Sequence, residues 1–218
     1  MLLAEAALER SPVTRDRLMD AAERLMAERG FAAVSVREIC AVAGTQISSI
    51  TYHFGSKEQL LDAIFDRRSV PMDRERSRLM DACEPAVLGR SPTIRELLYA
   101  YCEPVFALAK EPAGLLFIRL KQHVQVGETN LSNRLKKKYI EPGARRFVAL
   151  LQDAFPQTPV RSLYWRFNVI VGALFSLVRD ATSIATLSDG AVEVDYDAAR
   201  DEFIAFLASG WEAADAAR

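Results

Sequence analysis

The sequence of 218 residues is 50% hydrophobic, and its 28 basic and 29 acidic side chains give a formal net charge of −1. This apolar content excludes an intrinsically disordered chain, and the length suffices for a buried core in one or two domains. The near-zero charge gives no overall attraction to nucleic acid, so any DNA affinity must come from local placement of side chains.

The cysteines and the apolar runs exclude further classes. Cys40, Cys83 and Cys102 are odd in number and lack C-x-x-C spacing, which argues against a disulfide framework or zinc site and favours buried thiols. The chain start lacks a signal-peptide pattern, and the most apolar run, 167–178, is too short to span a bilayer. We therefore expect a soluble, cytoplasmic protein.

The first predicted helix follows an Ala- and Glu-rich stretch at residues 1–10, which has no helix cap and is expected to be a frayed or variable extension. Ser11-Pro12 or Thr14 begins the helix, and Gly30 ends it. The apolar residues at helical spacing between them are Leu18, Ala21, Ala22, Leu25 and Met26.

A second helix begins with a capping box. The Ser35 hydroxyl can accept a hydrogen bond from the backbone of Glu38, and the Glu38 carboxylate can reach back to the backbone of Ser35. The helix runs from Val36 and stops at Gly44, because glycine turns the chain at the least steric cost.

A third short helix follows after a turn of two or three residues. It begins at Thr45 or Gln46 and ends near Phe54, because Gly55 comes next. Two short helices joined by a glycine-containing turn are typical of a helix-turn-helix, whose second helix enters the major groove of DNA.

This third helix has two faces on a wheel of about 100° per residue. Ile47, Ile50 and Phe54 fall on one side, which predicts a buried face. The opposite side carries Gln46, Ser48, Ser49, Tyr52 and His53. No carboxylate occurs between Glu38 and Glu58, so nothing on the polar face repels phosphate. An amphipathic helix of an ordinary bundle fits the same wheel equally well.

A fourth helix is expected from Ser56, which forms a cap with Gln59, toward Arg68. Its apolar residues are Leu60, Leu61, Ile64 and Phe65. Pro71 ends or bends this helix, because proline lacks the backbone N–H that a helix interior requires. This helix connects the helix-turn-helix to the rest of the chain.

The remaining sequence predicts helices separated by proline and glycine. The expected segments are 72–87, 93–110, 113–126, 131–155 with a kink near Pro142-Gly143, 160–186 and 195–214. Residues 191–194 are a candidate for a brief extended piece. The predicted fold class is therefore all-α, with an N-terminal three-helix helix-turn-helix domain followed by a larger helical domain.

Two helices of the larger domain carry apolar residues on two faces. In 160–186, one stripe is Leu163, Phe167, Ile170, Leu174, Leu177 and Ala181, and the other is Trp165, Val169, Gly172 and Ser176. In 195–214, the two sides are Phe203, Phe206 and Gly210, and Ile204, Leu207 and Trp211. A helix that is apolar on two sides needs two partners, so one face of each can meet a second subunit. The centre of a monomeric bundle is the alternative.

The first third of the chain, about residues 11–66, resembles the tetracycline-repressor-like (TetR) family of regulators. The matching residues are the first helix from Thr14 to Gly30, Phe31, Ser35, Ile39, Ala43-Gly44, Ile50, Tyr52-His53-Phe54 and Ser56-Lys57-Glu58-Gln59-Leu60. The resemblance implies a DNA-binding domain at 11–55, a connecting helix at 56–71 and an effector-binding and dimerisation domain at 72–214.

The resemblance also implies site residues. Those for DNA are Arg37, Gln46, Ile47, Ser48, Ser49, Thr51, Tyr52, His53 and Lys57, of which Tyr52 and Lys57 would contact phosphate. The two predictions for Ile47 disagree, because the helical wheel places it on the buried face whereas the resemblance places it at the DNA surface. The last two helices of each subunit would form a four-helix dimer interface through Trp165, Val169, Gly172, Ser176, Phe203, Phe206 and Gly210.

In the resembling family the larger domain usually encloses a small-molecule pocket. The candidate lining residues here are Tyr99, Phe106, Phe117, Arg119, His123, Trp165 and Asn168. Arg119 and His123 are four residues apart and share a helix face, so they could meet an anionic group. A structural hydrogen bond made by His123 is the alternative.

A basic run of Arg134, Lys136, Lys137 and Lys138 also suggests a nucleic-acid contact. It lies far along the chain from the helix-turn-helix. A solvated helix face is therefore the favoured interpretation.

An enzyme is not expected. His53 and His123 are the only histidines, and the sequence contains no nucleophile elbow, phosphate-binding loop, H-E-x-x-H motif or metal-ligand cluster. No cofactor and no metal are predicted. A cysteine redox switch is weakly supported, because no resolving pair is evident.

Together these features predict a homodimeric, ligand-responsive transcriptional regulator, most simply a repressor that binds a pseudo-palindromic DNA operator and is released by a small-molecule effector. The second helix of each helix-turn-helix, one from each subunit, would enter successive major grooves roughly 34 to 36 Å apart. The alternative is a helical ligand-binding or scaffolding dimer without a DNA function.

Overall fold

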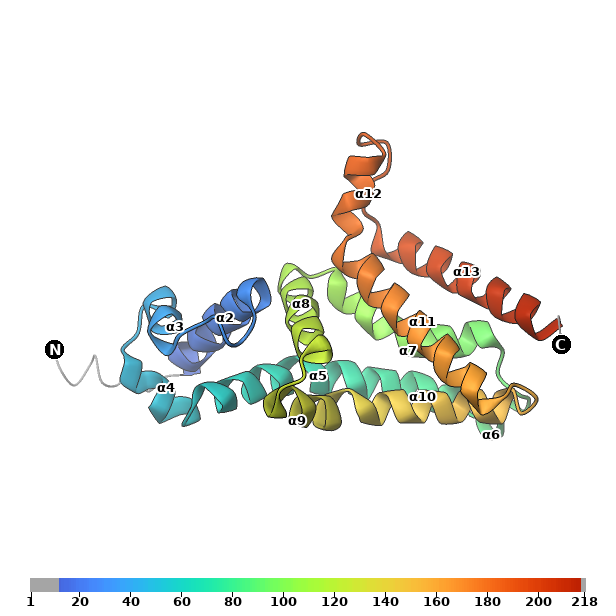
Figure 1. Ribbon diagram of the computed structural model, residues 1–218, viewed down its shortest axis with the longest axis horizontal. Coiled ribbons are helices and arrows are strands. Elements are labelled where there is room, and N and C mark those ends of the chain that lie inside the picture. Colours follow the sequence, from blue (N-terminus) through green and yellow to red (C-terminus); the bar gives the residue numbers. More distant parts are fainter. Residues whose placement is uncertain (1–11, 217–218) are drawn as a thin grey trace. The chain divides into compact units, whose positions relative to one another are not determined.

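Helices form all of the regular structure in residues 12–216, the part of the chain that the computed structural model describes (Figure 1). They are α2 (Pro12–Arg29), α3 (Val36–Ala43), α4 (Ile47–Phe54), α5 (Lys57–Ala82), α6 (Pro85–Leu88), α7 (Ile94–Ala109), α8 (Pro112–Val126), α9 (Asn130–Tyr139), α10 (Glu141–Ala154), α11 (Val160–Arg179), α12 (Ala181–Leu187) and α13 (Tyr196–Ala216). The all-α prediction is confirmed, and residues 191–194 form no strand. The extension predicted at residues 1–10 lies outside the described range. Within that range, no helix is both long enough and apolar enough to cross a membrane.

The chain divides into two compact units. Unit 1 contains the described residues up to Val70 together with Leu116–Tyr139, and unit 2 contains Pro71–Leu115 and the residues from Ile140 onward. Helices α5 and α8 each begin in one unit and continue into the other. The segment 116–139, which the sequence assigned to the larger domain, thus packs within unit 1.

Aromatic packing explains why this segment joins unit 1. The ring of Phe65 on α5 lies 5.1 Å from that of Phe117 on α8 and 5.2 Å from that of Tyr139 on α9, measured between centroids. Phe65 and Phe117 are fully buried. Apolar contacts between segments far apart in sequence therefore decide the membership of α8 and α9.

A buried carboxylate fixes α2 to α5 in unit 1. Glu23 is 2% exposed and accepts hydrogen bonds from Arg67 Nη2 at 2.6 Å and from Arg68 Nε at 3.1 Å. Arg67 also pairs with the exposed Asp20 at 2.7 Å. Because a buried charge is tolerated only when it is paired, this cluster fixes the first helix on the connecting helix.

Three helix boundaries differ from the prediction. Helix α5, 26 residues long, continues through Pro71, because the burial of residues before and after the proline, such as Phe65 and Met72, offsets the lost backbone hydrogen bond. The segment 131–155 is two helices, and Pro142 lies in the first turn of α10 rather than at a kink. The segment 160–186 breaks at Asp180 between α11 and α12.

The core of unit 2 is built from aromatic side chains of α7, α10 and α13. The Tyr101 ring stacks on that of Phe147 with centroids 4.4 Å apart, and Phe106 contacts Phe203 at 5.8 Å. Cys102, in the same core, is fully buried, and desolvation raises the pKa of its thiol to about 12. Cys40 and Cys83 are also buried, so the prediction of buried thiols is confirmed.

Candidate nucleic-acid interface

The capping box predicted at the start of α3 is present. The Glu38 backbone N–H donates to Ser35 Oγ at 3.2 Å, and the Ser35 backbone N–H donates to Glu38 Oε2 at 2.8 Å. The Ser35 backbone N–H and the Ser35 hydroxyl both donate to the Glu38 carboxylate at 2.8 Å, and with one hydrogen bond from Arg29 they lower the pKa of Glu38 to about 2. The only carboxylate of α3 is therefore engaged in holding the helix start.

Gly44 ends α3 in the left-handed conformation, with φ 62° and ψ 44°. A Cβ atom at this position would lie 2.6 Å from Nη2 of Arg17. The left-handed backbone conformation therefore favours glycine at the turn that sets α4 against α3.

Most of the polar face of α4 is accessible. Ile47 is 50% exposed and Tyr52 is 64% exposed. The other exposed residues of this stretch are Gln46, Ser48 and Thr51. His53 is half-buried, and its ring meets that of Tyr52 edge to face at 5.1 Å. Arg37 of α3 is also exposed.

Ser49 does not belong to this face, and its predicted DNA contact is contradicted. It is 3% exposed, and among the described residues its Oγ atom has no hydrogen-bond partner. The wheel also misplaced Ile47, which is exposed while Ile50 is buried. Two turns of helix fix the direction of the buried face poorly, so packing against the neighbouring helices decides it.

Lys57 holds the turn between α2 and α3, which differs from the phosphate contact predicted for it. Its Nζ atom donates to the carbonyl oxygens of Phe31 at 2.8 Å and Val34 at 2.6 Å, and lies 4.0 Å from the centroid of the Phe31 ring. Burial lowers the pKa of Lys57. Two of its three donors are thus satisfied within the protein.

Replacing Lys57 with methionine should lower the free energy of unfolding by about 1–2 kcal/mol, because two charge-assisted hydrogen bonds are lost while the apolar stem is kept. Urea denaturation followed by circular dichroism measures this change. Lys137→Met, at an exposed position of α9, is the matched control and should change stability by less than about 0.5 kcal/mol. Equal stabilities of the two variants would contradict the role assigned to Lys57.

Two arginines of α2, which the sequence did not single out, lie at this end of unit 1. The Arg15 guanidinium lies 5.3 Å from the centroid of the Phe54 ring of α4, and Arg17 reaches the carbonyl of Gly44 at 3.4 Å. Both are exposed. They add positive charge beside α4, and their place in the first turns of the first helix was the only signal for them.

The basic run of α9 is engaged mainly with its own unit. Arg134 pairs with Asp62 of α5 at 2.8 Å, Lys138 with Asp66 at 3.3 Å, and Lys136 donates to the carbonyl of Gly127 at 2.7 Å. These contacts join α9 to α5 and to the preceding turn. They favour a structural role over a second nucleic-acid site.

The residues predicted for an effector pocket are divided between the two units. In unit 1, Phe117 is in the core, Arg119 is exposed, and Nε2 of His123 lies 3.2 Å from the Ala27 carbonyl oxygen, which matches the structural alternative for His123. In unit 2, Phe106 is in the core, whereas Tyr99, Trp165 and Asn168 are exposed. Tyr99 and Trp165 line two separate grooves.

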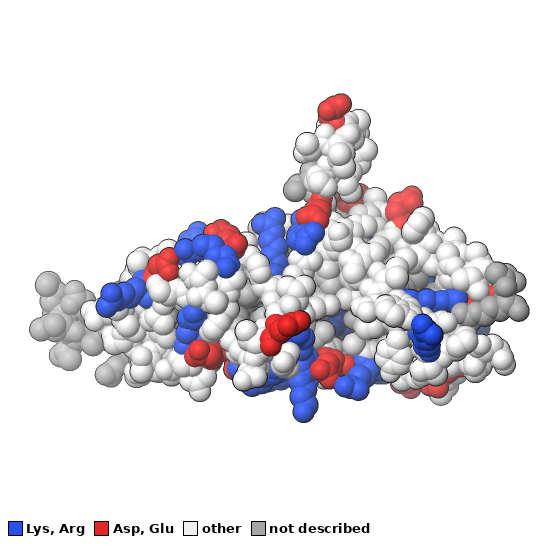
Figure 2. Space-filling view, in the orientation of Figure 1, with Lys and Arg blue, Asp and Glu red and all other residues white. Residues whose placement is uncertain are grey.

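The predicted dimer residues mostly share an exposed apolar face of α11 and α13. Trp165, Val169 and Phe206 are 63%, 60% and 80% exposed, and Gly172, Ser176 and Gly210 are also exposed. Figure 2 shows a broad uncharged area over these two helices. A groove of about 440 Å³ lies in this face. The predicted role of Phe203 in the dimer interface is wrong, because Phe203 is 6% exposed and packs on Phe106 within its own unit.

Comparisons with known proteins agree with this geometry. Residues 18–64 match the family model described as "Bacterial regulatory proteins, tetR family", and residues 99–210 match "Tetracyclin repressor-like, C-terminal domain". The chain is similar to an uncharacterized HTH-type transcriptional regulator of Mycobacterium tuberculosis, with 35% identity over 78 residues, which is 35% of this chain and 39% of the relative. It is also similar to the HTH-type transcriptional repressor KstR2 of Rhodococcus jostii, with 46% identity over 50 residues, 23% of this chain and 24% of that protein.

Among solved structures, the chain resembles the transcriptional regulator FadR from Bacillus subtilis in complex with stearoyl-CoA. The TM-score is 0.59 at 18% identity, over 89% of this chain and 97% of FadR. At this identity the likeness concerns the fold alone. The matches to the two sequence relatives span 39% and 24% of their lengths.

Proposed function

This chain belongs to the TetR family of bacterial transcriptional regulators, and we propose on that premise that it binds a pseudo-palindromic DNA operator as a homodimer, represses transcription and is released by a small-molecule effector. The repressor KstR2 among its relatives supports repression, and the stearoyl-CoA bound to the similar FadR supports a small-molecule effector.

The observation that carries this proposal is the exposed, carboxylate-free face of α4. Ser48, Thr51 and Tyr52 offer hydroxyl groups for phosphates and base edges, and the exposed Ile47 offers an apolar contact for a thymine methyl group. Arg37 on α3 and Arg15 on α2 supply cationic groups for the DNA phosphates on either side of α4.

Dimerisation is proposed through the exposed apolar face of α11 and α13. Large aromatic side chains such as Phe206 and Trp165 are rarely left in water in a contiguous patch unless the patch is an interface. At Gly172 and Gly210 a Cβ atom would meet nothing within 4 Å in the same chain. Small residues here allow a second backbone to approach closely.

Release of DNA requires that the effector bind one conformation of the protein more tightly than the other. Helix α5 begins beside the helix-turn-helix at Lys57 and ends at Ala82 in unit 2, so a ligand that acts on its last turns acts on an element common to both units. The effector-free conformation is proposed to be the one that fits two successive major grooves.

Fluorescence anisotropy with the promoter DNA next to the protein's own gene tests DNA binding. Tyr52→Ala should weaken binding roughly tenfold, because an exposed phosphate donor is lost, whereas Ser49→Ala should retain the wild-type affinity because Ser49 is buried. Arg37→Ala should weaken binding and reduce the slope of log K against log salt by about one.

Circular dichroism of each variant separates loss of contact from loss of fold. Salt-insensitive binding, or no specific binding at any neighbouring promoter, would instead favour the helical ligand-binding dimer without a DNA function. An unbiased genomic binding screen would then identify the operator if it lies elsewhere in the genome.

A further inference from the structure

A second groove lies within unit 2, away from the proposed dimer face. It has a volume of about 510 Å³ and lies between the end of α5, the short α6, α7 and α13. Its apolar lining consists of Leu79, Ala82, Cys83, Leu88, Ala100 and Ile204, and its polar lining of Arg95, Glu96, Tyr99 and Asp201. Volume and lining both fall in the range of small-molecule sites.

The two carboxylates that line this groove have ion-pair partners, whereas its arginine has none in the part of the chain that the structure describes. Glu96 is held by Arg90 at 2.6 Å and by the Thr93 backbone N–H, which lower its pKa to about 2. Asp201 is held by Arg200 at 2.8 Å. Arg95 is exposed and has no hydrogen-bond or ion-pair partner among the residues of the described range. The available charge in the groove is therefore cationic.

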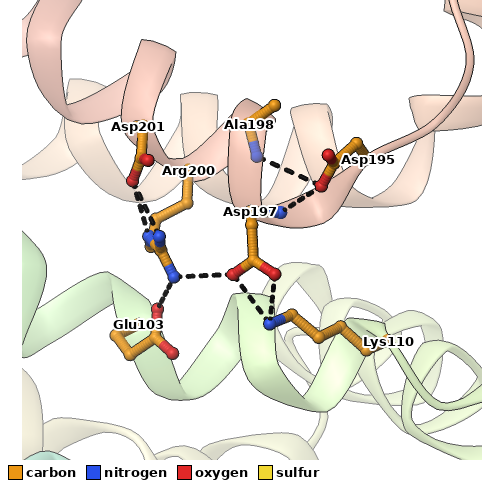
Figure 3. Close-up of polar contacts among 7 residues, drawn as sticks. All are labelled: Glu103, Lys110, Asp195, Asp197, Ala198, Arg200 and Asp201. Carbon is orange, nitrogen blue, oxygen red and sulfur yellow. Dashed lines mark hydrogen bonds and ion pairs between the residues drawn. The ribbon is translucent and has the colours of Figure 1, made fainter.

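An ionic network fixes the wall that α13 contributes (Figure 3). Arg200 donates to Glu103 of α7 and to Asp197 at 2.8 Å each, and Lys110 at the end of α7 pairs with Asp197 at 2.7 Å. The Arg200 guanidinium lies 5.5 Å from the centroid of the Tyr99 ring, which lines the groove. Hence the groove is preformed, and a ligand need not organise it.

Arg95 and Tyr99 are four residues apart on α7, so their side chains are neighbours on one helix face. A guanidinium and a phenol hydroxyl beside an apolar floor suit a molecule with one anionic end and an apolar body. A cationic amphiphile fits less well, because Glu96 and Asp201 are already paired.

We propose that this groove binds a small amphipathic anion, with its apolar body on Leu79, Ala100 and Ile204 and its anionic group on Arg95. This inference rests on the proposed function, in which it locates the effector site and names the ligand class. Leu79 and Ala82 belong to the last turn of α5, so an occupant contacts the helix that continues into unit 1.

The test uses the full-length protein without DNA and the anionic fluorophore 1-anilinonaphthalene-8-sulfonate as probe. Dodecanoate, dodecanol and dodecyltrimethylammonium, all below their micellar concentrations, compete for it. Dodecanoate should displace the probe at about tenfold lower concentration than dodecanol, because one charge-assisted hydrogen-bonded pair distinguishes them. Arg95→Gln should abolish that difference, and the control Arg161→Gln, at an exposed position of α11, should preserve it.

Ala82, exposed on α5, allows the groove to be filled without altering the core. Ala82→Trp should weaken binding of the probe and of dodecanoate at least about tenfold, whereas Ala82→Ser should leave both unchanged. A thermal melt of each variant verifies folding. Undiminished binding in Ala82→Trp, a dodecanoate preference that persists in Arg95→Gln, or equal competition by dodecyltrimethylammonium would each overturn the proposal.

The two proposals fail separately. If dodecanoate binds as expected but the protein binds no specific DNA, the groove assignment stands and the regulator function falls. If the protein binds its operator but no probe or dodecanoate binds in calorimetry, the groove assignment falls alone. Release of operator DNA by dodecanoate in the wild type, but not in Arg95→Gln, would tie the groove to regulation.

Discussion

Replacing Phe206 with glutamate is expected to convert the protein from dimer to monomer at micromolar concentration. Phe206 is 80% exposed and belongs to the apolar face of α11 and α13. In a twofold interface each substitution acts twice, and a buried unpaired carboxylate opposes association by several kcal/mol, roughly a hundredfold or more in the dissociation constant. Sedimentation equilibrium measures the change.

The same variant should lose operator affinity by roughly a hundredfold, because a monomer addresses one half-site only. Val87→Glu, a substitution of equal character at a 66% exposed position of α6, is the control and should remain dimeric. A dimer that persists in Phe206→Glu would place the interface on another surface. The DNA-binding face proposed on α4 would be unaffected by that result.

The second large effect is expected at Glu23, where alanine should lower the free energy of unfolding by about 3–5 kcal/mol. The side chain of Glu23 is 3% exposed, and its removal leaves the guanidinium groups of Arg67 and Arg68, only 25% and 20% exposed, without their shared partner. Arg68 would then have no counter-ion among the described residues, and Arg67 would keep only the exposed Asp20. A largely buried charge that loses its buried counter-ion is among the few single changes with effects of this size.

Urea denaturation gives the magnitude, and Asp20→Ala is the matched control. Asp20 pairs with the same Arg67 but is 66% exposed, so its loss should lower the free energy of unfolding by less than about 1 kcal/mol. Exchanging both Arg67 and Arg68 for methionine in the Glu23→Ala background should recover part of the lost stability. If Glu23→Ala and Asp20→Ala proved equally mild, the cluster would not be what fixes α2 on α5.

Local sequence sufficed wherever the determining interactions span one or two helical turns. Ser35 and Glu38 form their capping box with partners three residues apart, and Gly44 adopts the left-handed conformation expected of it. The helix-turn-helix and the all-α class followed from such short-range rules. The exposed stripe of α11, from Trp165 to Ser176, followed from helical periodicity.

Tertiary packing decided which face of a helix is buried and which residues come together. Ser49 is buried and Ile47 exposed because α4 is too short for its own pattern to fix its orientation. Phe203 faces Phe106, 97 positions earlier in the sequence, rather than a second subunit. The groove at Arg95 brings together residues of α5, α7 and α13, three helices that are far apart in the sequence. Sequence spacing carries information about one helix at a time, whereas burial depends on the neighbours that folding brings beside it.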